Sequence, residues 1–249
     1  MGQRRSPLGV AELELVAARG WPGLEQEQLG DWLLRAGGGW TGRANSALVV
    51  GDPGLPLPDA VAAVAGWYDA RGLRPCAQLP GVRSRAADAA FAAAGWTVAE
   101  EVLVLTAPLA PGAVPGFPVD LAPAPDDAWL AGYHHPDGPL PPVAREVLGN
   151  APGVVFASLR LDPAPAPPAA VARGVLTDGW LGVSAVTVRP EHRRRGLATA
   201  VVAALQHWAA DRGATSVYLQ VSAGNAPARA LYRQAGFIEH HRYHYRRRG

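Results

Sequence analysis

The sequence predicts an α/β (α+β) protein in which a mixed sheet with flanking helices occurs twice in tandem. Runs of alternating or β-branched residues, such as Val183–Val188, indicate strands. They alternate along the chain with alanine-rich runs whose apolar residues recur at the spacing of a helix. Residues 106–127 are rich in Pro, Ala and Gly, which is typical of a connector. We therefore expect a first domain at 1–107, a linker at 108–118 and a second, complete domain at 119–249.

The composition is that of a soluble globular protein. Hydrophobic residues make up 49% of the 249 residues and charged residues 18%, and the net charge is only +2. This balance gives no polyanion-binding signature. No apolar run approaches the roughly 20 residues of a membrane span, so we expect no membrane partner. The basic N-terminus lacks the apolar run of a signal peptide. The single cysteine, Cys76, excludes an intrachain disulfide and a cysteine metal cluster, which fits a reducing cytoplasmic compartment.

The first domain is expected to alternate short helices and strands. Its helices are predicted over 8–19, 59–71 with Asp59 as cap, and 84–95. Its strands are predicted over 29–36, 43–50, 75–79 and 96–105. Gly37-Gly38-Gly39 stands between the first two strands, and we interpret it as their hairpin turn. Cys76 falls on a short strand and is expected to belong to the core.

The second domain is expected to follow the same alternation. Its strands are predicted over 119–122, 153–161, 169–177, 181–188, 216–221 and 238–246. Its helices are predicted over 126–133, 142–148, from Gly196 to about Arg212, and 227–235. The last strand, which ends in a basic tail, is expected at an edge of the sheet. That tail could contact nucleic acid, but it has no recognition motif and the domain is not strongly basic, so we do not expect such a partner.

The stretch from Leu181 to Ala203 has the parts of an anion site. A strand ends near Val188, three arginines follow, and a helix begins after Gly196. Backbone N–H groups at a helix start lack partners, and the helix dipole favours negative charge there. Glycine lets an anion approach the backbone closely, and arginine side chains suit phosphate. A solvated basic loop is the alternative, and it has most weight for Arg193.

From Leu181 onward the chain resembles the GNAT superfamily of acetyl-CoA-dependent N-acetyltransferases. The matching parts are Ala185–Val188, then Arg193-Arg194-Arg195-Gly196-Leu197-Ala198, then Asn225 and Ala230–Phe237. Each part alone is weak, but the ordered set with the expected elements between its parts is specific. Residues 119–180 fit the family by pattern only.

The resemblance implies acetyl-CoA as co-substrate, a primary amine as acceptor and no metal. The CoA pyrophosphate would lie on the N–H groups from Arg194 to Thr199, and the pantetheine arm on the edge of the strand at Val186 and Val188. That strand would splay from the next one and leave a slot for the acyl group. The implied cofactor-binding residues are Val186, Thr187, Val188, Arg193, Arg194, Arg195, Gly196, Leu197, Ala198, Thr199 and Asn225.

The resemblance also gives Tyr232 the role of general acid toward the leaving thiolate, with direct attack by the amine. A packed helix aromatic is the alternative for Tyr232. For Asn225 a helix N-cap is as good an interpretation as a ligand contact, and both can hold.

The general base is left open by the sequence, because Leu181–Val188 holds no carboxylate. Glu191, Asp178, His134, a chain of waters, or no base at all remain. His134-His135 has no third ligand at metal spacing, so it does not predict a metal site.

The first half resembles an eroded copy of the second. Trp67, Arg71 and Gly72 match Trp208, Arg212 and Gly213, and at the same offset Ala94-Gly95-Trp96 matches Ala235-Gly236-Phe237. Phe91 then stands opposite Tyr232 and Ser84 opposite Asn225. The counterpart of the basic turn, Gly51–Pro58, holds prolines and no basic residue, so it offers fewer backbone donors. We expect one active site, in the second half.

The leading hypothesis is an N-acetyltransferase, and the alternative is an acyl-CoA-binding regulatory module without turnover. The acceptor amine and the oligomeric state are left open. If the halves face each other, the cluster of Arg35, Trp40, Arg43 and Asn45 would line an acceptor site.

Overall fold

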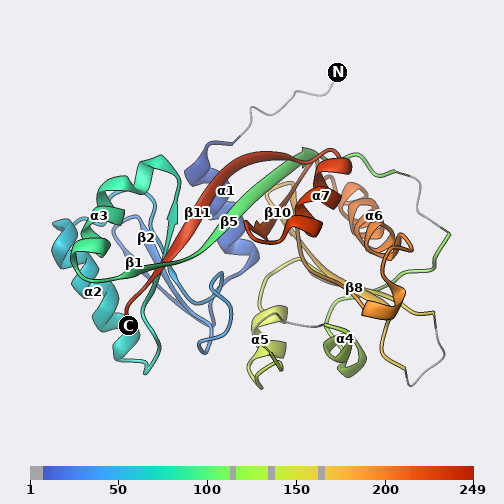
Figure 1. Ribbon diagram of the computed structural model, residues 1–249, viewed down its shortest axis with the longest axis horizontal. Helices are drawn as coiled ribbons and strands as arrows, with labels where there is room; N and C mark the ends of the chain where they lie inside the picture. Colours follow the sequence, from blue (N-terminus) through green and yellow to red (C-terminus); the bar gives the residue numbers. More distant parts are fainter. Residues whose placement is uncertain (1–7, 113–115, 134–137, 162–165) are drawn as a thin grey trace.

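A computed structural model describes residues 8–112, 116–133, 138–161 and 166–249. Its strands are β1 (Glu25–Leu29), β2 (Trp32–Ala36), β3 (Ala47–Leu48), β4 (Cys76–Pro80), β5 (Thr97–Pro108), β6 (Asp120–Ala122), β7 (Val154–Leu159), β8 (Ala170–Thr177), β9 (Trp180–Val188), β10 (Ser216–Ser222) and β11 (Ile238–Arg247). They form one eleven-stranded mixed sheet in the order β1-β2-β3-β4-β11-β5-β10-β9-β8-β7-β6 (Figure 1). The mixed α/β sheet agrees with the predicted fold class, but the strands of both halves form one continuous sheet, where the sequence analysis expected a sheet in each half.

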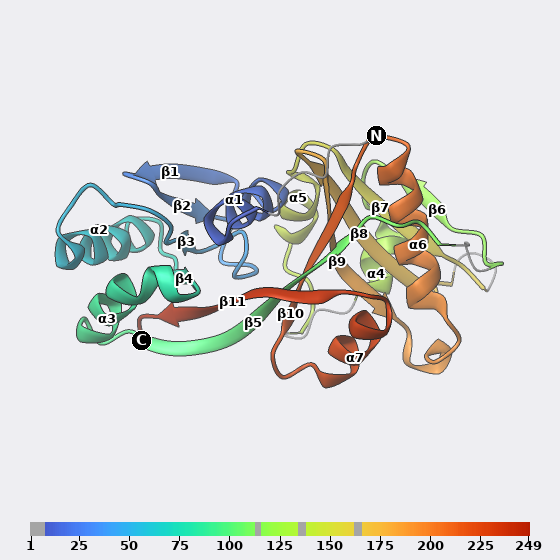
Figure 2. The same ribbon diagram turned by 90° about the horizontal axis from the view of Figure 1, so that it is seen from above.

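The helices cluster at the two ends of this sheet. They are α1 (Val10–Gly20), α2 (Leu57–Asp69), α3 (Arg85–Ala93), α4 (Asp127–Gly132), α5 (Ala144–Gly149), α6 (Leu197–Ala210) and α7 (Ala226–Gln234). In Figure 2 α2 and α3 lie at one end, α4, α6 and α7 at the other, and β5 and β11 run between them. α1 packs against β8 and β4, so the first helix of the chain contacts strands of both halves.

The two long strands β5 and β11 connect the halves. β11 pairs with β4 on one side, Tyr243 opposite Pro80, and with β5 on the other. β5 in turn pairs with β10, Leu103 opposite Val221. Each half thus receives its neighbouring strand from the other half. The prediction that 238–246 forms an edge strand is therefore wrong, because the first half supplies strands that flank it.

Three apolar clusters account for most of the core. One surrounds α6 and includes Val201 and Leu205, and a second surrounds α2 and α3 and includes Trp32 and Phe91. A third joins the two halves and contains Trp21, Trp40, Ala44, Trp129, Tyr133, Ala144, Val147, Leu148, Phe156 and Val171. Residues from before and after residue 118 share this third cluster, so burial of apolar surface also holds the halves together.

Elements of the two halves recur at the same interval along the chain. The interval that separates α3 from α7 also separates Gly72 from Gly213 and Gly95 from Gly236. All four glycines have positive φ, at 64°, 81°, 81° and 82°. They follow helices, where the left-handed conformation ends the helix and favours glycine.

Two local predictions are corrected near the N-terminus. The first hairpin joins β1 to β2 around Gly30, which has φ 57°. β1 escaped prediction because its residues, EQEQL, are polar and mostly exposed. Gly37–Gly39 opens a longer loop instead, and only Leu33 and Leu48 pair between β2 and β3.

Helix starts also differ from the sequence prediction in one place. α2 begins at Leu57, so Asp59 lies in its first turn and is not the N-cap. An acidic residue there still interacts favourably with the helix dipole. Asp126 does cap α4, since its side chain accepts from the Trp129 N–H at 2.6 Å.

Cys76 is buried in β4, as expected for a core residue. Burial raises the pKa of its thiol, which keeps it protonated and unreactive. Within the described ranges, no helix is long and apolar enough to cross a membrane.

Candidate functional site

β9 leaves its partner strand halfway along its length. It pairs with β10 in parallel from Trp180–Ser216 to Val183–Leu219, and the pairing ends there. Beyond that point a β-bulge re-aims β9: the register against β8 shifts between Val171 and Arg173, and Ala185 has φ 54°. Residues 184–188 therefore present an open strand edge toward β10. This matches the splayed slot that the sequence resemblance implied.

The turn after β9 delivers a helix N-terminus to the same place. Gly196 is the N-cap of α6 with φ 80°, and no described side chain caps the helix start. The N–H groups of the first turn consequently lack intrahelical partners and point along the axis. Arg194 also has positive φ, 60°. The geometry is suited to an anion held by backbone donors.

A cavity of about 870 Å³ runs from this helix start to the splayed strands. It is lined by most of the residues that the sequence singled out: Val186, Thr187, Val188, Arg193, Arg194, Gly196, Leu197, Ala198, Thr199, Asn225 and Tyr232. One predicted residue, Arg195, is not among them. Its side chain is exposed and one of its Nη atoms lies 3.2 Å from His192 Nδ1.

Arg193 is the arginine for which the sequence most favoured a solvated loop, but the structure gives it a bound position. Its Nε donates to the Val188 carbonyl at 3.3 Å, which ties the turn to the end of β9. It lines the cavity together with Arg194, so the solvated-loop alternative fits Arg195 better than Arg193.

Tyr232 combines both interpretations that the sequence allowed. It is 8% exposed and packs edge-on against Phe237, with ring centroids 5.7 Å apart. It also lines the cavity. Burial raises the pKa of its phenol to about 12, so the group is protonated at neutral pH. A protonated hydroxyl at a cavity wall can donate a proton or a hydrogen bond.

Asn225 likewise has two roles in the geometry. Its side chain accepts from the Ala228 N–H at 3.1 Å and so caps α7. It also lines the cavity, next to the end of β10. The N-cap alternative is therefore correct and does not remove the residue from the cavity.

Much of the remaining cavity lining comes from the first half and from β11, and of these residues the sequence had singled out only Arg43. Thr41, Gly42 and Arg43 belong to the loop after β2, and Glu100 and Val102 to β5. β11 adds Tyr243, Tyr245 and Arg247. Of the proposed acceptor cluster, only Arg43 reaches the cavity. The other three members are buried in the first half.

Those other members have structural partners. Asn45 Oδ1 accepts from the N–H groups of Gly37 and Gly39, both at 3.0 Å. Arg35 donates to Gln78 Oε1 at 2.8 Å, and Trp40 packs in the cluster between the halves. The acceptor role proposed for these three side chains is thus replaced by a supporting one.

Glu100 is the one carboxylate among the described residues that line the cavity. The alternation of β5 could have indicated it, because Glu100 and Val102 lie on one side while Glu101 lies on the other, 3.3 Å from Arg242. What the sequence could not indicate is that this first-half strand lies beside β10.

The other candidate bases lie elsewhere. Glu191 is half exposed and forms an ion pair with Arg189. Asp178 forms one with Arg19 at the β8–β9 turn. His134 is outside the described residues. No group of three metal-ligating side chains occurs in the described part of the chain.

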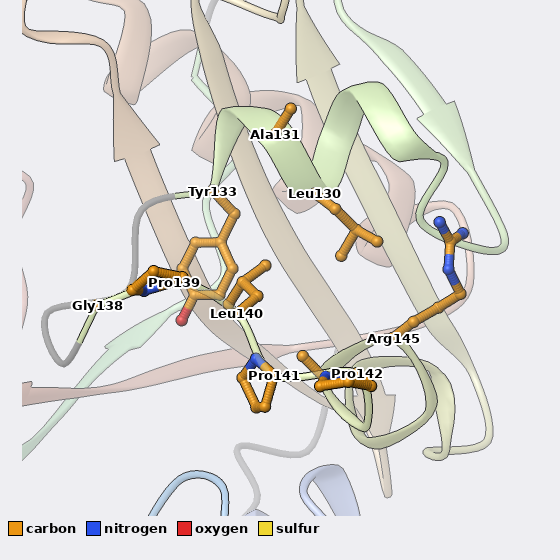
Figure 3. A pocket seen from close by; sticks show the side chains of 10 residues that line it. Leu130, Ala131, Tyr133, Gly138, Pro139, Leu140, Pro141, Pro142 and Arg145 are labelled. Atoms are coloured by element: carbon orange, nitrogen blue, oxygen red, sulfur yellow. The ribbon is translucent and has the colours of Figure 1, made fainter.

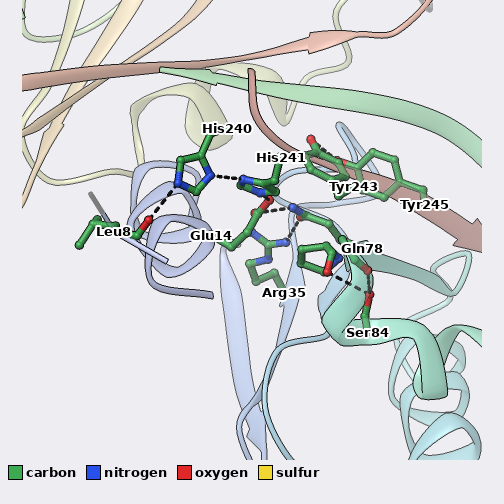
Figure 4. Close-up of polar contacts among 11 residues, drawn as sticks. Leu8, Glu14, Arg35, Gln78, Ser84, His240, His241, Tyr243 and Tyr245 are labelled. Atoms are coloured by element: carbon green, nitrogen blue, oxygen red, sulfur yellow. Dashed lines mark hydrogen bonds and ion pairs between the residues drawn. The ribbon is translucent and has the colours of Figure 1, made fainter. Parts of the chain in front are cut away.

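A buried polar chain stabilises the wall next to the cavity (Figure 4). Gln78 Nε2 donates to Glu14 at 2.7 Å, and His241 Nε2 lies 2.7 Å from the other oxygen of that carboxylate. His241 continues to His240, whose Nε2 lies 2.9 Å from the Leu8 carbonyl. These contacts fix α1 against β4 and β11, because breaking one would leave a buried polar group unsatisfied.

Figure 3 shows a second cavity, of about 670 Å³. It is lined by the α4–α5 region, including Leu130, Leu140, Pro141 and Arg145. Tyr133 lines both cavities.

The sequence matches a family over almost its whole length. Residues 9–246 match the family described as "Probable histone acetyltransferase Rv0428c C-terminal". The Mycobacterium tuberculosis protein named "Probable histone acetyltransferase Rv0428c" is 32% identical over 251 residues, which cover 95% of this chain and 73% of that protein. The Bacillus subtilis protein named "Uncharacterized N-acetyltransferase YobR" is 28% identical and covers 95% of this chain and 98% of its own length.

A solved structure shares the fold across the whole chain. The GCN5-related N-acetyltransferase from Kribbella flavida superimposes with a TM-score of 0.68 at 20% identity. The match covers 97% of this chain and 96% of that one. The arrangement of both halves around one sheet is therefore found in another protein of this kind.

Proposed function

This chain belongs to the family described as probable histone acetyltransferase Rv0428c C-terminal and is an N-acetyltransferase of the GNAT kind, and from that premise we propose how its cavity works. The reaction moves an acetyl group from acetyl-CoA to a primary amine by direct attack within a ternary complex. The observation that carries the proposal is the cavity itself, which joins a helix N-terminus, a splayed strand edge and a buried phenol.

The cofactor would lie along one wall. The N–H groups from Arg194 to Thr199 would hold the pyrophosphate, with the Arg193 and Arg194 side chains beside it. The pantetheine arm would hydrogen-bond to the open edge of β9 at Val186–Val188, as an added strand does. Asn225 would contact the arm near the end of β10, and a backbone N–H near Val186 would stabilise the developing oxyanion.

The proton transfers divide between two side chains. The amine nitrogen attacks the thioester carbonyl, the C–S bond breaks, and Tyr232 donates its proton to the departing thiolate. Glu100 accepts the proton that the attacking amine loses, directly or through one water. Its place across the cavity from the cofactor wall supports this role.

We also propose that the chain is a tandem of two GNAT-like halves, 1–107 and 119–249, joined by a linker at 108–118. The shared interval between α3 and α7, and between their following glycines, supports a duplication. In the first half Phe91 stands where the second has Tyr232. The N-cap of α2 is Pro56, and the sequence between Arg43 and Arg71 holds no basic residue. The first half would then provide acceptor-side residues and no second active site.

The acceptor class is a primary amine. The name of the mycobacterial relative refers to histones, so a protein lysine is one candidate here. A cytoplasmic location follows from the single buried thiol of Cys76 and stays a prediction.

The cofactor proposal is tested by a matched pair of charge reversals in one turn. Arg194→Glu should weaken acetyl-CoA binding about 10-fold or more, because a cavity-lining cation becomes an anion beside the phosphates. Arg195→Glu changes the same charge outside the cavity and should change the Kd less than about 3-fold. Isothermal calorimetry with acetyl-CoA measures both. Equal effects of the two variants, or no binding by the wild type, would overturn the proposal.

The acid role of Tyr232 is tested by turnover. Tyr232→Phe should lower kcat about 100-fold while the Kd for acetyl-CoA stays near that of the wild type. Because its pKa is raised to about 12, the wild type should keep its rate at pH values where an ordinary phenol near pH 10 would ionise. Release of CoA is measured over a panel of amines. Binding without turnover of any amine would instead favour the regulatory module.

A further inference from the structure

Arg173 is a fully buried guanidinium on the sheet face opposite α6. Its Nε donates to the Leu148 carbonyl at 2.8 Å and its Nη2 to the Gly20 carbonyl at 2.9 Å. These carbonyls lie in the last turns of α5 and α1, whose dipoles favour a cation. Its Nη1 has no partner within the described residues. The charge is therefore compensated by dipoles and by no carboxylate.

Arg43 brings a second guanidinium to the same tryptophan ring. Its Cζ lies 4.2 Å from the centre of the Trp21 ring, and Arg173 Cζ lies 4.3 Å from the same centre. Burial, and then repulsion from Arg43, lowers the pKa of Arg173 to about 9. Across the described ranges no carboxylate pairs with either arginine, so positive charge is in excess here. Such an excess is costly unless an anion completes it.

Ser184 adds an unpaired hydroxyl directly at the cavity. It is 8% exposed, lines the large cavity, and its Oγ has no partner in the part of the chain that the structure describes. In the sheet it stands opposite Arg173, on the residue before the β9 bulge. A buried hydroxyl without a partner is uncommon in proteins and is explained when a ligand completes it.

The charges on the cavity wall agree with an anionic ligand. The charged lining residues that the structure describes are Arg43, Arg193, Arg194, Arg247 and Glu100. Arg193 and Arg194 lie at the end where the phosphates of CoA are proposed to bind. Arg43 comes from the loop after β2 and not from the turn proposed to hold the phosphates, so we do not expect the cofactor phosphates to neutralise its charge. The acceptor is the molecule that can supply one.

We propose that Arg43 and Ser184, backed by Arg173, form a subsite for a carboxylate of the acceptor, so that the enzyme prefers amines that also carry a carboxylate. This inference rests on the proposed acetyl transfer. The amine would lie near the β9 bulge, between Glu100 and the thioester, while its carboxylate reaches inward to Arg43. A bidentate guanidinium is suited to that group. The acceptor class is thus an amino acid or the C-terminal residue of a peptide, which narrows the protein-lysine candidate to a lysine at a C-terminus.

The test compares amines with and without a carboxylate at equal concentrations of the neutral amine. Glycine, β-alanine, 4-aminobutyrate and L-lysine are each assayed against the corresponding carboxamide. The full-length wild type should show a kcat/KM at least about 10-fold higher for the best acid than for its amide. Arg43→Met should remove this preference through KM, and Arg43→Lys should restore part of it. The Kd for acetyl-CoA should not change. Arg83→Met, at an exposed position, is the matched control.

Each outcome decides for or against the subsite. If carboxamides react as well as acids, the subsite is wrong while acetyl transfer stands. If no amine of the panel reacts, calorimetry of the CoA complex with N-acetylglycine against N-acetylglycinamide decides. Equal binding of the two overturns the subsite. If Arg43→Met fails to fold, Ser184→Ala should lower the acid-to-amide ratio at unchanged acetyl-CoA affinity. Failure of acetyl-CoA to bind the wild type would overturn the proposed function itself.

Discussion

Glu100 differs from its neighbour Glu101 in one respect that matters for chemistry. Both are exposed carboxylates on β5, but strand alternation turns Glu100 to the cavity and Glu101 to Arg242. Glu101 forms an ion pair with Arg242, whereas Glu100 lines the cavity, where it can accept a proton from the ammonium group of a substrate. The pair therefore forms a natural comparison within one strand.

Glu100→Gln should lower kcat/KM about 100-fold at neutral pH, because the amide cannot accept the proton that the attacking amine loses. The loss should shrink as the pH rises toward the pKa of the amine, where the acceptor arrives neutral. Glu101→Gln should retain most activity. A pH–rate profile of the three proteins measures this. A flat ratio of Glu100→Gln to wild type across the pH range would exclude the proton-accepting role.

The sequence predicted the cavity residues of the second half from β9 to α7, and it missed most of those that the first half and β11 contribute. Residues 186–188, the turn before α6, Asn225 and Tyr232 were found because they are local in the chain and their order is specific. Arg43 was expected there only as one of four cluster members, and Glu100 was not found, because no local pattern indicates which side chains a distant strand brings beside β10. Arg195 was expected to bind the cofactor, but whether a side chain in a turn faces inward depends on φ values that its neighbours set.

Among the elements, α3 and β11 are joined by a compact polar contact. Arg246 Nε lies 2.5 Å from Asp88 Oδ1, and His244 Nε2 lies 2.8 Å from the same oxygen. Arg246 also donates to the Trp96 carbonyl at 2.8 Å. The hydrogen bond from Arg246 is the main cause that lowers the pKa of Asp88. The contact thus connects the last strand with a helix of the first half.

Asp88→Asn should destabilise the folded chain by about 1 kcal/mol at pH 7, since a partly exposed ion pair is lost. A carboxyl with a lowered folded-state pKa stabilises the protein above its unfolded pKa near 4, and this stabilisation disappears as the pH falls through the folded value. The difference between variant and wild type should therefore fade below about pH 4. Urea unfolding at several pH values measures it. A difference that is independent of pH would contradict the assigned cause.

Element prediction succeeded where periodicity is strong and failed at polar strands. α6, β9 and α7 were found nearly to the residue because apolar spacing and glycine stops agree. β1 was missed since an exposed hairpin strand needs no apolar face. β11 was found as a strand, but its central place in the sheet depends on β4, which lies far away along the chain.

The whole molecule is a single sheet with shared strands, so its halves are not independent. β5 lies between β11 and β10, and removing either half exposes backbone groups along two long strands. Heat or denaturant should therefore unfold the chain in one transition followed equally by tryptophan fluorescence and far-UV circular dichroism. Acetyl-CoA at about 100 times its Kd should stabilise the entire transition by about 2.7 kcal/mol. If the chain unfolded in two separate transitions and acetyl-CoA stabilised only one of them, the halves would be independent and the prediction would be wrong.

The position of β11 has a consequence for the nascent chain. The first half finishes only when a strand from beyond α7 slides between β4 and β5. During synthesis, β4 and β5 are translated early, and β11, which pairs with both of them, is translated last. Contacts so distant in sequence form late. Unpaired strand edges of the nascent chain can pair with other chains and aggregate. A chaperone that binds apolar strand edges during translation would therefore raise the yield of folded protein.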